Sequence, residues 1–184
     1  MLPCARPWRI LTVLAVIGGV VLAASPAWAH VEVDPGSEPR AGAVVFAFRT
    51  PNEEQSAATV RLDVQFPTDH PFLNVLVENK PGWTFTTQTG PLPKPVTTDD
   101  GTFTTAVTEV SWVATGGGIP PGAFDRFSVF ATTPSSGSKV TFKAIQTYSN
   151  RDVVRWIETP VKGAPKPEHP APVMTLTKAQ PSGG

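Results

Sequence analysis

The residue with the most distinctive potential chemistry is His30, because a candidate processing site, Ala27-Trp28-Ala29, directly precedes it. Cleavage after Ala29 would make His30 the first residue, with a free α-amine beside its imidazole Nδ1. These two nitrogens can close a chelate ring on one metal ion, and an amine with a pKa of roughly 8 can bind near neutral pH. Together with a carboxylate oxygen they form a tetragonal ligand set that favours Cu(II). The alternative is that His30 follows the processing site by chance.

Residues 1–29 have the features of a secretory signal peptide. Arg6 and Arg9 supply a positive start, and residues 10–24 form an uninterrupted run of small and apolar side chains. This run is short for a membrane span, and the A-W-A sequence that follows it suits signal peptidase. The competing interpretation is an uncleaved membrane anchor. We therefore expect a signal peptide at residues 1–29 and a secreted protein of the cell envelope.

Composition and motif content exclude several classes of function. The chain holds 15 Lys and Arg against 15 Asp and Glu, so it lacks the basic character that binding to nucleic acid or to an anionic membrane surface requires. Its single cysteine, Cys4, precedes the apolar run, which leaves the processed chain without the thiolate of a blue-copper centre. The P-loop, G-x-S-x-G and H-E-x-x-H motifs are missing from the sequence. We expect no enzyme activity, no nucleic-acid partner, and membrane contact only through an anchor outside these residues.

The elements that would position His30 are predicted to be β-strands. Residues 59–66 alternate strictly between apolar and polar side chains, which is typical of a half-buried antiparallel strand. Similar short runs recur at residues 31–33, 43–49, 75–77, 107–113, 124–131, 139–148 and 153–157. About eight strands separated by Pro, Gly and Asn clusters predict an all-β fold, an antiparallel β-sandwich.

The predicted sandwich covers residues 30–160. Within it, residues 91–105 mix prolines with polar residues and are expected to form a long excursion that ends in a hairpin at Asp100-Gly101. Residues 161–184 are rich in proline and are expected to form a tail. Within this tail, residues 173–176 are left open as a last edge strand.

Seven ordered motifs run through the chain: H-V-E-V at 30–33, F-R-T-P-N-E-E at 48–54, P-G-W at 81–83, V-S-W at 110–112, I-P-P-G-A-F-D-R-F at 119–127, Q-T-Y-S-N at 146–150 and V-V-R-W-I-E at 153–158. In these motifs the chain resembles YcnI-like proteins, a family of bacterial extracytoplasmic copper-binding proteins. This resemblance implies a cupredoxin-like or immunoglobulin-like sandwich. It also implies copper homeostasis, with Cu(II) held in a single-histidine brace by the N-terminal His, a carboxylate and a nearby Trp.

Carried over by position, the resemblance makes His30, Glu53 and Trp156 the candidate metal site. Trp156 would cap the site and exclude water, although a core role is an equal alternative because large aromatic residues in strands usually pack. Glu53 is the first choice of carboxylate because it follows an early strand; Glu158 is second and Glu109 third. Many relatives have Glu where this chain has Ala123, which would weaken binding if that Glu were a ligand.

The resemblance implies a buffer or a metallochaperone whose partners are copper ion and a membrane copper transporter or another copper-handling protein. A structural or adhesive envelope protein without a specific metal function is the alternative. The remaining histidines, His70 and His169, are expected to lie in solvent. If either reached His30, a two-histidine brace with oxygenase chemistry would return as a third possibility.

Overall fold

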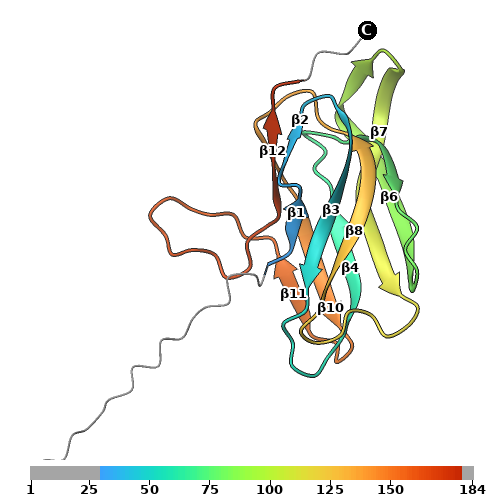
Figure 1. Ribbon diagram of the computed structural model, residues 1–184. Helices are drawn as coiled ribbons and strands as arrows, with labels where there is room; N and C mark the ends of the chain where they lie inside the picture. The colour runs from blue at the N-terminus through green and yellow to red at the C-terminus, as the bar shows by residue number, and fades with distance from the viewer. Residues whose placement is uncertain (1–29, 180–184) are drawn as a thin grey trace, which may run out of the picture.

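The structure, a computed structural model, describes residues 30–179 and consists of β-strands joined by turns and loops (Figure 1). The strands are β1 (Glu32–Asp34), β2 (Ser37–Pro39), β3 (Ala43–Pro51), β4 (Thr59–Gln65), β5 (Leu73–Val77), β6 (Trp83–Thr98), β7 (Gly101–Ala114), β8 (Phe124–Thr132), β9 (Lys139–Thr141), β10 (Lys143–Tyr148), β11 (Val153–Trp156) and β12 (Val173–Thr177). In this part of the chain, no helix has the length and apolar character needed to cross a bilayer. The predicted all-β class is confirmed.

Two sheets form the body of the sandwich and a small third sheet lies at one end. The strand orders are β1-β3-β8-β5 in the first sheet, β11-β10-β4-β7-β6 in the second, and β2-β12-β9 in the third. The pairings in the two large sheets are antiparallel. The edge strands β1 and β11 lie on the same side of the molecule (Figure 1). This arrangement places His30, two residues before β1, close to Trp156, the last residue of β11.

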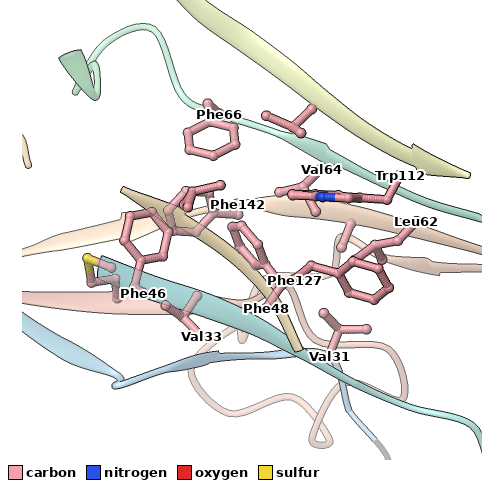
Figure 2. Close-up of a cluster of buried hydrophobic side chains, with 14 of the residues drawn as sticks. Val31, Val33, Phe46, Phe48, Leu62, Val64, Phe66, Trp112, Phe127 and Phe142 are labelled. Carbon is pink, nitrogen blue, oxygen red and sulfur yellow. The ribbon is translucent and has the colours of Figure 1, made fainter. Parts of the chain in front are cut away.

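The core lies between the two large sheets and is dominated by aromatic side chains (Figure 2). Phe48 is fully buried and meets Phe142 and Trp112, with ring centroids 5.1 Å and 6.3 Å away. Each such side chain contributes roughly 1.5–3 kcal/mol by leaving water. Val31 and Val33 belong to the same cluster. Strand β1 is therefore anchored in the core from the residue that follows His30.

The prediction of a long excursion at residues 91–105 is wrong, because these residues belong to a long β-hairpin formed by β6 and β7. Strands β6 and β7 pair from Trp83 opposite Ala114 to Thr98 opposite Gly101, with a register shift between Pro91 and Val96. The prolines are tolerated because β6 is an edge strand, where a missing N–H removes no ladder bond from the sheet interior. The turn itself lies at Asp99-Asp100, one residue before the predicted position.

The folded part of the chain extends beyond residue 160. Strand β12 pairs in parallel with β2 and antiparallel with β9, and it buries Met174 and Leu176. Residues 173–177 are thus part of the domain, whereas the loop before them projects from the body (Figure 1). The proposed signal peptide, residues 1–29, lies outside the described residues.

Candidate metal-binding site

Trp156 stands at the centre of the candidate site. It ends β11, where it pairs with Ala144 of β10, and only 5% of its surface is exposed. Its indole Nε1–H donates a hydrogen bond of 3.0 Å to Oε1 of Gln146. The orientation of the indole is therefore set by a buried partner as well as by packing.

Gln146 connects this indole to the end of another strand. The side chain is fully buried, and its Nε2 donates to the carbonyl of Pro51 at 2.9 Å and to Oγ1 of Thr59 at 2.7 Å. A buried amide makes such bonds because an unpaired polar group costs about 1–3 kcal/mol. Gln146 thus ties Trp156 to the end of β3 and the start of β4. Gln146 is not among the residues predicted from the sequence, although a polar residue at an inward position of β10 is a usable signal.

His30 lies against Trp156. The two ring centroids are 5.6 Å apart with the planes at 63°, an edge-to-face arrangement. The position follows from β1, in which Glu32 pairs with Arg49 of β3 and the flanking valines are buried. The structure therefore brings together two of the three residues chosen from the sequence.

His169 also lies against Trp156, which corrects the expectation that it is solvated. Its ring centroid is 5.2 Å from that of Trp156, with the planes at 80°. Its backbone N–H donates to Oε2 of Glu158 at 3.1 Å, and its carbonyl accepts from the N–H of Glu158 at 3.1 Å. The ring is thus held where the chain returns to the body from the loop between β11 and β12. By contrast, His70 is half-buried in a separate cleft and lies 3.3 Å from Asp69.

Glu53 lies in the loop between β3 and β4, whose two ends Gln146 contacts. A cleft of about 270 Å³ is lined by Pro51, Glu53, Glu54, Tyr148, Val154, Trp156, Glu168 and His169. The turn that carries the two glutamates is shaped by buried Asn52, whose Oδ1 accepts from the N–H of Glu54 at 2.9 Å and whose Nδ2 donates to the carbonyl of Ile119 at 2.8 Å. Glu53 and Trp156 therefore line the same cleft, whereas His30 lines a neighbouring cleft with Val31 and Glu32.

The other two candidate carboxylates have structural partners. Glu158 receives the His169 N–H and closes the base of the loop. Glu109 accepts a hydrogen bond of 2.7 Å from Gln88 of the β6–β7 hairpin. Neither lines the cleft that contains Trp156 and Glu53. Glu32, next to His30 in sequence, is ion-paired with Arg49.

Tyr148 adds a neutral hydroxyl to the cleft. Burial, followed by the negative charges of Glu54 and Glu53, raises the pKa of Tyr148 to about 12, although a hydrogen bond with Thr59 lowers it in part. Without a bound ion, the phenol therefore stays protonated at neutral pH.

Side chains alone do not form a complete metal site in the described residues. Between residues 30 and 179, no three His, Cys, Asp or Glu side chains are grouped closely enough to hold an ion. An imidazole, nearby carboxylates and an indole are in place, so a bound ion would need a further donor. The α-amine of a processed His30 is a donor of this kind.

Comparison with known proteins assigns the chain to a family. Residues 30–176 match the family described as a domain of unknown function, DUF1775. The chain is 28% identical over 142 residues to the copper-binding protein CutI of Bacillus subtilis, a match that covers 77% of this chain and 62% of CutI. The chain thus spans about three fifths of the length of this relative.

A solved structure supports the same assignment. The crystal structure of an uncharacterized protein from Nocardia farcinica, described as having an immunoglobulin-like fold, is 35% identical with a TM-score of 0.64. The match covers 81% of this chain and 99% of that one. It confirms the predicted sandwich. The chain therefore belongs to the DUF1775 family, the YcnI-like family that its motifs indicate.

Proposed function

We propose that this protein binds Cu(II) outside the cytoplasm and either buffers the ion or passes it to a partner. Cleavage after Ala29 frees His30, whose α-amine and imidazole bind the ion with the carboxylate of Glu53, beside the indole of Trp156. The observation that carries this proposal is the packing of His30 against a Trp156 that is fixed by Gln146 and shares its cleft with Glu53. The similarity to a protein named for copper binding supports the choice of metal.

The donor set suits a carrier of Cu(II). Two nitrogens from one residue and one carboxylate oxygen form the tetragonal N,O set that Cu(II) prefers. Such a set leaves a coordination position open, through which a partner can remove the ion by ligand exchange. Because the indole N–H of Trp156 is already bonded to Gln146, the indole turns its carbon framework toward His30 and excludes water there.

Among the carboxylates, the geometry favours Glu53. It lines the Trp156 cleft and is exposed, so it is accessible to an ion. Glu158 and Glu109 are engaged in hydrogen bonds elsewhere. Ala123 contributes no carboxylate in this chain.

The location is proposed from the signal peptide expected at residues 1–29, and the partners are proposed from the ion that the protein would carry. Export would place the protein in the cell envelope, where a membrane copper transporter or another copper-handling protein would receive or donate the ion. No catalytic step is part of this proposal.

The test compares two chains that differ only in their first residues. The buried core runs from Val31 to Leu176, so a chain of residues 30–184 and an extended chain of residues 26–184 both contain it. The extended chain keeps the imidazole of His30 but moves the α-amine four residues away. We expect the chain that begins at His30 to bind one equivalent of Cu(II), with a tetragonal paramagnetic resonance spectrum and nitrogen couplings. The extended chain should bind more than about 100-fold more weakly.

Variants of the first chain test the other ligands. Glu53→Gln should weaken Cu(II) binding, whereas Glu109→Gln serves as the matched control and should not. Equal affinity of the two chains would overturn the brace and leave a structural or adhesive envelope protein as the better hypothesis. An equal loss in both Glu variants would remove the assignment of Glu53 alone.

A further inference from the structure

We propose that the outer face of the sheet β1-β3-β8-β5 is an interface through which two copies of this chain associate. Three apolar side chains on this face, Val45, Phe130 and Leu76, are called the apolar row below. None of them lines the two clefts beside His30 and Trp156. The inference therefore goes beyond the proposed function and does not rest on it.

The register of three strands makes the apolar row a continuous feature. Val45 of β3 pairs with Phe130 of β8, and Phe130 pairs with Leu76 of β5. Side chains directly opposite each other in an antiparallel pair have Cβ atoms about 4.5–5.5 Å apart. The three side chains thus form one apolar strip across the sheet. In the adjacent row of the same face, Ala47 pairs with Ser128, so small side chains border the strip.

The apolar row is exposed to a degree that a face in contact only with water does not require. Val45 is 62% exposed, Leu76 is 64% exposed and Phe130 is 39% exposed. Single exposed apolar residues are normal on a protein surface, whereas adjacent ones in one strip mark a site of contact with another molecule. The strands β3 and β8 that carry the row lie side by side in the first sheet (Figure 1).

The outer face of the second large sheet is built differently. Nε of Arg61 in β4 donates to both carboxylate oxygens of Asp63, and the hydroxyl of Ser111 in β7 donates to Asp63 as well. A polar network of this kind is typical of a sheet face that water covers. The contrast within one molecule indicates that the two outer faces have different surroundings.

The size of the face favours a second copy as its partner. Strands β3 and β8 have nine residues each. With about 3.4 Å per residue and about 4.8 Å between strands, the four-stranded face measures roughly 500 Å². Two such faces in contact bury about 1,000 Å², which is the lower limit for a specific interface. The face is therefore large enough for a weak dimer.

The charges around the apolar row also agree with self-association. Arg49 and Arg126 lie opposite each other on the same face, where they are ion-paired with Glu32 and Asp34. Charges that are compensated within one chain can form the polar rim of an interface between like molecules. The whole chain has 15 Lys and Arg and 15 Asp and Glu, so no large net charge keeps two copies apart.

The experiment measures the mass of the chain of residues 30–184 by sedimentation equilibrium, with EDTA present so that no metal ion links two chains. We expect the mass to rise from one chain toward two between about 5 μM and about 500 μM, because an interface of this size is weak. Phe130→Lys and Leu76→Lys should each weaken association by at least about tenfold, because each buries a charge. Val113→Lys is the matched control and should leave association unchanged, because Val113 pairs with the exposed Arg61 on the other sheet.

Leu76→Lys also guards against effects on folding, because it changes the most exposed side chain of the row; tryptophan fluorescence in urea checks that the variants are folded. A chain that stays monomeric up to about 500 μM would overturn the proposal. Binding of this monomer to phosphatidylcholine vesicles would then assign the row to a lipid surface. Association that the three Lys variants leave unchanged, or weaken equally, would also contradict the proposal by placing the contact elsewhere. Because copper is absent from these measurements, none of these outcomes bears on the proposed function.

Discussion

At the scale of single residues, Gln146 is the side chain on which the candidate site depends without touching an ion. Its amide makes three hydrogen bonds, to Trp156, Pro51 and Thr59. Gln146→Leu should lower the free energy of unfolding by about 2–4 kcal/mol, because it leaves the indole N–H and the Pro51 carbonyl unpaired. It should also lower Cu(II) affinity by about 10- to 100-fold by releasing the indole.

A double-mutant cycle measures how strongly Gln146 and Trp156 are coupled in the folded protein. Unfolding in urea is measured for Gln146→Leu, Trp156→Phe and the double variant, with the exposed Gln65→Leu as the control, which should change stability by less than about 0.5 kcal/mol. In the Trp156→Phe background no indole N–H is left unpaired, so Gln146→Leu should cost about 1 kcal/mol less. Additive effects on the free energy of unfolding would mean that the hydrogen bond between Gln146 and Trp156 does not fix the orientation of the indole.

At the scale of elements, β12 decides how much of the chain is the domain. Met174 is fully buried between β2 and β9, whereas its neighbour Val173 is 38% exposed. Met174→Ala should therefore cost about 2–5 kcal/mol in a urea titration, and Val173→Ala less than about 1 kcal/mol. Small and equal losses of stability in the two variants would instead mean that residues 161–184 form a tail that does not pack on the domain.

The same scale shows what periodicity predicts well. Strands with one buried face, such as β4, were found from alternation alone, because inward and outward side chains differ in type. Strand β6 was missed because most of its residues are exposed and three are proline. Its strand character comes from backbone pairing with β7. Backbone pairing at the edge of a sheet leaves no hydrophobic pattern in the sequence.

At the scale of the whole molecule, the titration of Tyr148 makes the free energy of unfolding depend on pH in the alkaline range. Its pKa is raised from 10.0 to about 12 by burial and by Glu54 and Glu53. For a group with a raised pKa, the stabilisation is fully present below the unfolded value and is lost as pH rises through the folded value. Stability should therefore fall between about pH 10 and pH 12.

This titration can be read directly, because Tyr148 is the only tyrosine in the sequence. The ultraviolet absorbance of tyrosinate should rise with a midpoint near 12 in the folded protein and near 10 in urea. Glu54→Gln should move the folded midpoint downward, whereas Glu109→Gln, with its carboxylate on the β6–β7 hairpin, should not. A folded midpoint near 10 would contradict the burial and charge that the structure gives this residue.

The sequence by itself determined the class of fold, the family and the identity of His30 as the leading candidate donor. These follow from short-range patterns: alternation within strands, ordered motifs, and the residue after a processing site. Only the tertiary structure decided that Glu53, and not Glu158 or Glu109, shares a cleft with Trp156, and that His169 packs against the same ring. The physical reason is that the order of strands in the sheets and the path of the loop between β11 and β12 bring together residues that are far apart in the chain. The spacing of neighbouring side chains determines neither of them.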